Sequence, residues 1–227
     1  MKSKALIVVT SHSKLGETGK PTGYYLPEVT HPYFELEKAG FEIDIASPLG
    51  GEAPMDQSSR DLSDEANRKF LEQPALVAKL KKTIALEKIN PKEYTAILYA
   101  GGHGTMWDFA ESKEINRVTA EIFENKGVVA AVCHGPAALV NVKLSNGKFL
   151  VDGKHVTGFS NAEEEAAKLT ETMPFLLQTA LEERNAKYEK APLWNKKVVV
   201  DGNLVTGQNP ASAKGVGEAI VNILKNR

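Results

Sequence analysis

Short apolar runs alternate along the chain with longer segments in which apolar and charged residues are mixed. The runs predict buried strands at residues 5–10, 41–47, 94–100, 127–133, 155–159 and 197–207. The mixed segments predict helices at residues 31–40, 64–86, 113–127, 136–142, 161–185 and 214–227. Alternating strands and helices predict a doubly wound α/β fold, with a mostly parallel sheet and helices on both faces.

The chain is predicted to form one domain over residues 1–227, because no linker rich in Gly, Ser or Pro divides it. Residues 48–91 are long for a single crossover and predict a partly helical insertion. The octapeptides VDGKHVTG at 151–158 and VDGNLVTG at 200–207 echo each other. Because Asp-Gly between β-branched residues is typical of a tight turn, both octapeptides predict hairpins.

Composition narrows the classes of function. A formal net charge of -1 gives no reason to expect a nucleic acid partner. No apolar run approaches the ~20 residues that cross a membrane, so no membrane partner is expected. The single cysteine cannot form an internal disulfide, and this favours a reducing, cytoplasmic location.

That cysteine lies in the stretch KGVVAAVCHGPAALV, between a predicted strand and a predicted helix. A nucleophile elbow has small residues two positions before and after its nucleophile, as Ala131 and Gly135 are for Cys133. The backbone N–H of His134 would then point towards an oxyanion. A helix beginning near Pro136 would lower the pKa of the thiol. The alternative is an inert, buried cysteine, and spacing alone does not separate the two.

Nucleotide and metal sites are not predicted. The stretch GETGKPT resembles a phosphate-binding loop, but Lys14 stands where its first glycine belongs and Pro21 where Ser or Thr belongs. The five histidines are scattered, without a His-x-x-x-His or Cys-x-x-Cys pair. We therefore expect neither a cofactor nor a metal.

For the other polar residues near predicted strand ends, the sequence does not separate a functional role from a purely structural one. Glu28 could be a solvated acid in the first turn of a helix. His103, inside a glycine-rich loop, is ambiguous. Glu163, Glu164 and Glu165 could together form an exposed helix start that the helix dipole favours. The residues alone do not choose among these three glutamates.

Four motifs, AVCHGPAAL, LYAGGHGTMWD, TGYYLPEVTHPYFELEKAGFEID and LVTGQNPASA, occur in an order that resembles the ThiJ/PfpI superfamily. The resemblance covers nearly the whole chain and implies its class I glutamine amidotransferase-like fold, a flavodoxin-like sheet. Within the superfamily the chain is similar to the heat-shock chaperone branch. Members of this branch are described as glutathione-independent glyoxalase III and protein deglycase.

The resemblance also implies roles for individual residues. Cys133 and His134 match the cysteine–histidine pair, and Glu28 matches a glutamate that contacts the thiol and shuttles protons. Counting from the TGF motif places the acidic third member on Glu164, although which of the three neighbouring glutamates faces His134 stays open. Gly102 and the N–H of His134 would form the oxyanion hole.

The activity implied is that of a D-lactate dehydratase, in which methylglyoxal and water give D-lactate without metal, nucleotide or glutathione. The substrate would be a small 2-oxoaldehyde or a glycated side chain, and the protein would be a homodimer. Unfolded proteins are further expected partners. The alternatives are a holding chaperone without essential catalysis, a cysteine peptidase and, with least support, a glutamine amidotransferase.

Overall fold

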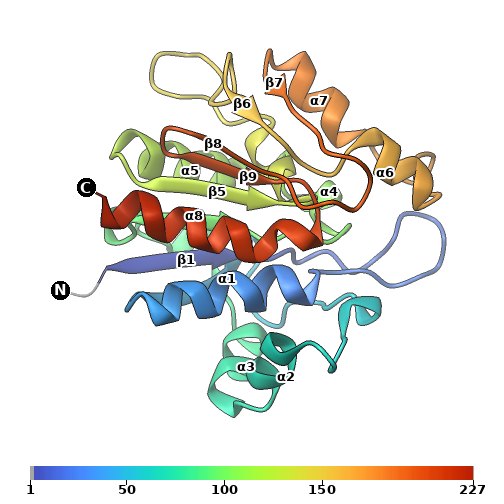
Figure 1. Ribbon diagram of the computed structural model, residues 1–227, viewed down its shortest axis with the longest axis vertical. Helices are drawn as coiled ribbons and strands as arrows, with labels where there is room; N and C mark the ends of the chain where they lie inside the picture. The colour runs from blue at the N-terminus through green and yellow to red at the C-terminus, as the bar shows by residue number, and fades with distance from the viewer. Residues whose placement is uncertain (1–2, 227) are drawn as a thin grey trace.

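The computed structural model describes residues 3–226 and contains a seven-stranded central sheet (Figure 1). The strands lie in the order β3-β2-β1-β4-β5-β9-β8, and only the pair β8–β9 is antiparallel. The predicted flavodoxin-like α/β fold is therefore confirmed. The strands are β1 (Lys4–Val8), β2 (Glu42–Ser47), β3 (Ile84–Ala85), β4 (Ala96–Tyr99), β5 (Val128–Val132), β8 (Val198–Asp201) and β9 (Leu204–Gly207).

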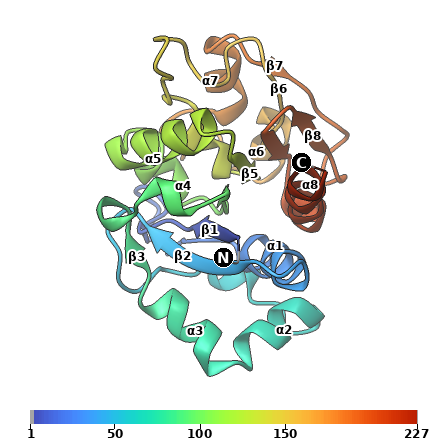
Figure 2. The same ribbon diagram turned by 90° about the vertical axis from the view of Figure 1, so that its left-hand side faces the viewer.

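Helices cover both faces of this sheet. Helices α1 (Leu26–Lys38) and α8 (Ala213–Lys225) lie together on one face, and α5 (Lys113–Glu124) lies on the other (Figure 2). The two helices approach closely at Gly217, where an added Cβ would lie 2.8 Å from the Cα of Pro32. With apolar residues of both helix layers against it, β5 is buried along its whole length.

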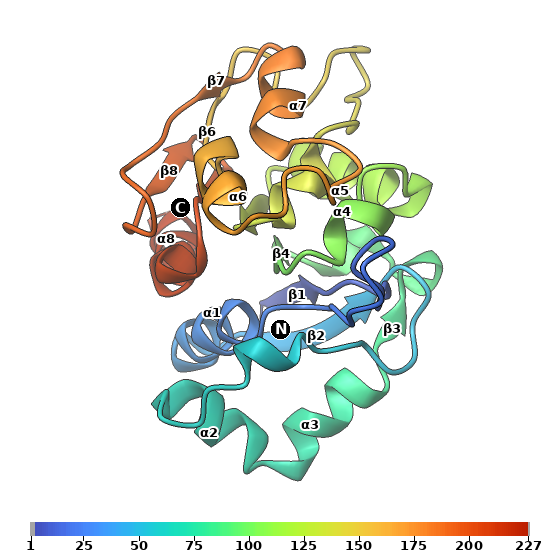
Figure 3. The same cartoon turned by 90° about the vertical axis from the view of Figure 1, so that its right-hand side faces the viewer.

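The carboxyl ends of the parallel strands meet at one end of the sheet, which Figure 3 views directly. Around that end lie the short helices α4 (Thr105–Asp108) and α6 (Asn161–Ala166). Ligands of open α/β sheets bind at this end.

The remaining helices are α2 (Glu65–Leu71), α3 (Pro74–Lys81), α7 (Leu177–Glu183) and the 3₁₀ helices η1 (Gln57–Ser59), η2 (Leu86–Lys88), η3 (Pro91–Glu93), η4 (Gly135–Leu139) and η5 (Pro210–Ser212).

Residues 48–91, predicted as an insertion, contain α2 and α3 and end beside the sheet edge. Their strand β3 pairs with β2. The predicted continuous helix over 64–86 is wrong, because Pro74 cannot donate a backbone hydrogen bond and begins a new helix after α2. The division into one domain over residues 1–227 stays a prediction.

Two other predicted elements differ from the structure. The octapeptide at 200–207 forms the β8–β9 hairpin, but the one at 151–158 does not form a hairpin. Its strand β6 (His155–Val156) pairs instead with the distant β7 (Lys187–Tyr188), in parallel. The predicted helix over 161–185 is two helices, because Lys168 adopts a left-handed φ of 60° that ends α6.

Within residues 3–226, none of the helices has both the length and the apolar character that crossing a membrane requires.

Candidate active site

Cys133 follows β5 directly and adopts a left-handed backbone conformation with φ of 59°. This conformation is strained for a residue with a Cβ, and the surrounding backbone holds it in place. The Cys133 N–H donates to the carbonyl of Gly207 at 2.9 Å, and its carbonyl accepts from Phe159 N at 2.8 Å. A Cβ at Gly135 would lie 2.1 Å from the carbonyl oxygen of Tyr99, so only glycine fits there. The chain therefore forms the predicted nucleophile elbow.

Glu28 lies in the first turn of α1 with a completely buried side chain. Its Oε2 accepts a hydrogen bond from the N–H of Gly101 at 2.7 Å. Its Oε1 is buried without a hydrogen-bond partner among residues 3–226. Burial raises the pKa of Glu28 to about 8, although the Cys133 thiol and the Gly101 N–H lower it in part. The solvated alternative for Glu28 is therefore wrong.

The expected lowering of the Cys133 pKa is also wrong. Burial raises the pKa of the thiol, and the neighbouring Glu28 carboxylate raises it further. The backbone N–H of His134 opposes both effects without outweighing them. The segment after the elbow is the five-residue 3₁₀ helix η4 and not an α-helix, so it brings only a small dipole to the sulfur.

His134 lies between the thiol and a carboxylate. Its Nδ1 is 3.4 Å from the Cys133 sulfur, and its Nε2 donates to Glu164 Oε2 at 2.7 Å. Burial and the nearby His103 lower the pKa of His134, which favours the neutral ring, although Glu164 opposes both effects. Burial alone would raise the pKa of Glu164, but the two imidazoles outweigh it and lower the pKa to about 2. An ionised Glu164 therefore fixes the tautomer that leaves Nδ1 free to accept a proton from sulfur.

The three neighbouring glutamates, left open by the sequence, have three different environments. Glu164 faces His134, as the count from the TGF motif predicts. Glu165 is exposed. Glu163 is completely buried, and its carboxylate accepts hydrogen bonds from Ser160 N and Oγ, Trp194 N and Asn209 Nδ2. An exposed helix start is thus wrong for Glu163 and Glu164.

His103 is the site residue whose role the sequence left ambiguous. Its Nε2 lies 2.9 Å from Glu164 Oε1, so both oxygens of this carboxylate have an imidazole partner. The rings of His103 and His134 have centroids 4.2 Å apart. Because His103 comes from the loop after β4, the rule that polar residues at strand ends meet would have found it.

Gly102 and the N–H of His134 are the groups predicted for the oxyanion hole. Gly102 has φ of 104°, and a Cβ there would lie 2.2 Å from the carbonyl oxygen of Gly23. The backbone N–H of His134 donates a hydrogen bond to the Cys133 sulfur. The loop before Gly102 also accepts a hydrogen bond at the Gly101 carbonyl from Tyr25 N, at 3.0 Å. Only glycine fits at position 102, and its catalytic role stays a prediction.

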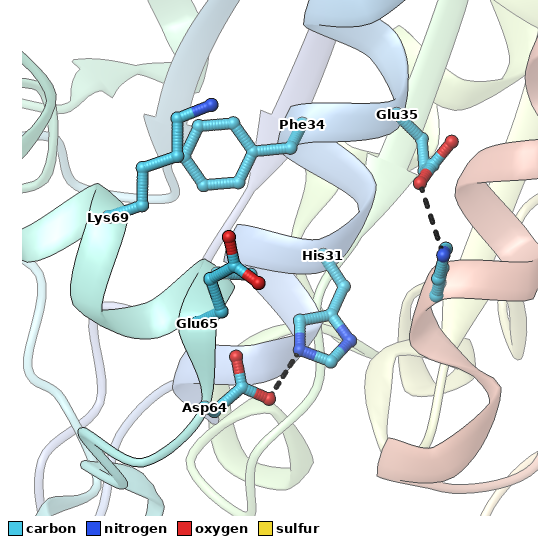
Figure 4. A pocket seen from close by; sticks show the side chains of 8 residues that line it. His31, Phe34, Glu35, Asp64, Glu65 and Lys69 are labelled. Carbon is cyan, nitrogen blue, oxygen red and sulfur yellow. Dashed lines mark hydrogen bonds and ion pairs between the residues drawn. The ribbon is translucent and has the colours of Figure 1, made fainter.

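A separate hollow of about 360 Å³ lies between α1, α2 and α8 (Figure 4). Two pairs form among the polar side chains that line it: His31 with Asp64 at 2.7 Å, and Lys214 with Glu35 at 3.8 Å. None of the predicted site residues lines it. The hollow is therefore separate from the buried cluster around Cys133.

Comparison with known proteins gives matches over nearly the whole chain. A family model described as the DJ-1/PfpI family matches residues 22–223. The Saccharomyces cerevisiae protein named glutathione-independent glyoxalase HSP31 is 31% identical, over 98% of this chain and 98% of that protein. Rapid Encystment Protein 24 KDa from Francisella tularensis is 44% identical with a TM-score of 0.95, covering 99% of each chain. The glyoxalase III structure from Candida albicans is 28% identical with a TM-score of 0.91, covering 97% of each chain.

Proposed function

The chain belongs to the DJ-1/PfpI family, and on that basis we propose that it is a glutathione-independent glyoxalase that converts methylglyoxal and water to D-lactate. The names of the relatives from Saccharomyces cerevisiae and Candida albicans support this activity. One observation carries the proposal: at the elbow, the Cys133 thiol lies against a completely buried Glu28 carboxyl, whose pKa burial raises to about 8.

The first step is addition of the Cys133 sulfur to the aldehyde carbon of methylglyoxal. The carbon–sulfur bond forms as the carbonyl π bond breaks, and the thiol proton reaches the new hydroxyl oxygen through Glu28 or His134 Nδ1. The product is a hemithioacetal. The N–H groups of Gly102 and His134 stabilise the oxygen while it carries negative charge.

The second step moves a proton between carbons. The Glu28 carboxylate removes the hydrogen of the former aldehyde carbon as a proton, which gives an enediolate. Glu28 then delivers this proton to the neighbouring carbon, and the hydroxyl proton moves to the second oxygen. The result is the thioester of lactate. A pKa of about 8 suits Glu28 to both taking and returning a proton near neutral pH.

The third step releases the product. Water attacks the thioester carbon, the carbon–sulfur bond breaks, and the Cys133 thiolate regains a proton. His134 is the base proposed for this water, because its Nε2–H is held by the ionised Glu164 and its Nδ1 faces the sulfur. Glu164 would stabilise the imidazolium that forms, as the third member of a triad does.

The burial of the nucleophile favours a small substrate. Cys133 is only 3% exposed. A small 2-oxoaldehyde could reach such a buried sulfur, whereas an extended peptide could reach it only if the surrounding loops moved. A cysteine peptidase is therefore the weaker candidate. Further parts of the proposal are action on glycated side chains, holding of unfolded proteins, a cytoplasmic location and a homodimer, all from the family resemblance.

The proposal is tested by incubating purified protein with methylglyoxal in glutathione-free buffer and measuring D-lactate. We expect steady formation of D-lactate by the wild type and none above background by Cys133→Ser. A wild-type protein that forms no lactate, or a variant that forms it at the wild-type rate, would reject the proposal.

A further inference from the structure

His103, His134 and Glu164 bring two imidazoles and one carboxylate together from three separate parts of the chain. Their ligating atoms all lie within 4.8 Å of one another. The two histidine Nε2 atoms lie 2.9 Å and 2.7 Å from the two oxygens of Glu164. The three residues are far apart in the sequence, because His103 lies in the loop after β4, His134 in the loop after β5 and Glu164 on helix α6. They therefore form no histidine pair at short sequence spacing.

The spacing of these atoms suits a tetrahedral zinc ion. Bonds of about 2.0–2.2 Å from one ion place tetrahedral ligand atoms about 3.3 Å apart. The two nitrogen–oxygen distances of 2.9 Å and 2.7 Å are slightly shorter than that value, and all the ligating atoms lie within 4.8 Å of one another, so small rotations of the side chains would bring all three onto one ion. Two nitrogens and one carboxylate oxygen form a donor set that Zn²⁺ accepts and Mg²⁺ disfavours.

The surroundings favour binding of an ion. The His103 side chain is 19% exposed and provides the approach from solvent, while Glu164 is 4% exposed. The ring of Phe159 packs 4.2 Å from His134 and forms an apolar wall. With His134 Nε2 bound to an ion, its Nδ1 would carry the proton and donate it towards the Cys133 sulfur at 3.4 Å.

We propose that His103, His134 and Glu164 form a Zn²⁺ site that reversibly inhibits the enzyme. The inhibition rests on the proposed function: an ion on His134 and Glu164 occupies the imidazole–carboxylate pair that activates water, and it reverses the tautomer of His134. The thiol is not a ligand, since His134 separates it from the Glu164 carboxylate.

Zinc binding is measured by calorimetric titration of ZnCl₂ into the wild type and four variants. We expect one ion per chain, with affinity reduced by about tenfold or more in His103→Gln and in Glu164→Gln. Cys133→Ser should bind as the wild type does. His31→Gln is the matched control, because His31 is also paired with a carboxylate, Asp64, at 2.7 Å, and it should bind normally.

Four results would overturn the site: no zinc bound by the wild type, unchanged affinity in His103→Gln, loss of binding in Cys133→Ser, or equal binding of Mg²⁺. Lactate formation with and without Zn²⁺, followed by chelator, tests the inhibition separately, and zinc bound without loss of turnover would overturn it. Binding is measured without substrate. A wild type that binds zinc but forms no lactate would therefore reject the proposed function and leave the site standing.

Discussion

At the scale of single residues, the chemistry depends on two acidic groups that share one buried space. The Cys133 thiol and the Glu28 carboxyl each have a raised pKa, because both are removed from water. The Glu28 carboxylate raises the pKa of the thiol further, whereas a hydrogen bond from the thiol lowers the pKa of Glu28 in part. Their protons leave in two steps that belong to the pair. Glu28 loses its proton first, since its pKa of about 8 is the lower one.

Removing the charge of Glu28 should therefore make Cys133 more acidic. In Glu28→Gln the amide keeps the shape of the side chain but places no negative charge beside the sulfur. We expect the pH midpoint of iodoacetamide alkylation to shift downwards relative to the wild type. An upward shift would mean that the thiol ionises before Glu28 and that the protonated carboxyl supports the thiolate.

The neighbours Glu164 and Glu165 offer a matched pair of substitutions on one helix. Glu164→Gln removes the charge that holds His134, and we expect turnover to fall by at least about 100-fold, the scale of a lost acid–base function. Glu165→Gln changes an exposed side chain and should stay near the wild type. Steady-state lactate formation measures both. Equal activities would remove Glu164 from the mechanism.

At the scale of elements, the site depends on how loops are tied together. The sequence predicted that α6 begins near residue 161, and Ser160 with Glu163 forms its capping box. It did not predict that the same carboxylate also binds Trp194 N and Asn209 Nδ2, because these partners lie 31 and 46 residues away. Local patterns indicate a cap, but they carry no information on which distant loop completes it.

Glu163 should therefore matter for stability. Glu163→Gln replaces an acceptor of four hydrogen bonds with an amide that places a donor against donors. We expect a loss of about 1–3 kcal/mol in the free energy of unfolding, measured by urea denaturation. Glu165→Gln is the control and should lie within about 0.5 kcal/mol of the wild type. A loss no larger than that of the control would mean that Glu163 only fills space.

At the scale of the whole molecule, the strand order gathers the site. Glu28, Gly102 and Cys133 follow β1, β4 and β5, and the parallel sheet brings the carboxyl ends of these strands together. Glu164 lies on α6, which follows β6 of the separate two-stranded sheet. The sequence predicted that polar residues following the strands would gather at one end of the sheet, because apolar runs and the residues after them are local features of the sequence. The thiol pKa could not be predicted, since it depends on burial and on the Glu28 charge that only the folded chain supplies.

The buried Glu28 should also make global stability depend on pH. Its pKa rises from 4.5 to about 8 on folding, so between these values the folded state holds a proton that the unfolded state releases. Its contribution is fully present below pH 4.5 and is lost as pH rises through about 8. We expect Glu28→Gln to gain stability relative to the wild type between about pH 5 and pH 8. Urea midpoints measure it, and a constant difference between the two proteins would contradict the raised pKa.

The central claim is that Cys133 forms a covalent intermediate and that Glu28 moves the proton on it. Its most direct test is to treat Glu28→Gln with methylglyoxal, quench, and measure both the intact protein mass and D-lactate. We predict a hemithioacetal adduct on Cys133 without lactate, whereas the wild type forms lactate and Cys133→Ser forms neither. Lactate from Glu28→Gln at the wild-type rate, or lactate from Cys133→Ser, would contradict the mechanism.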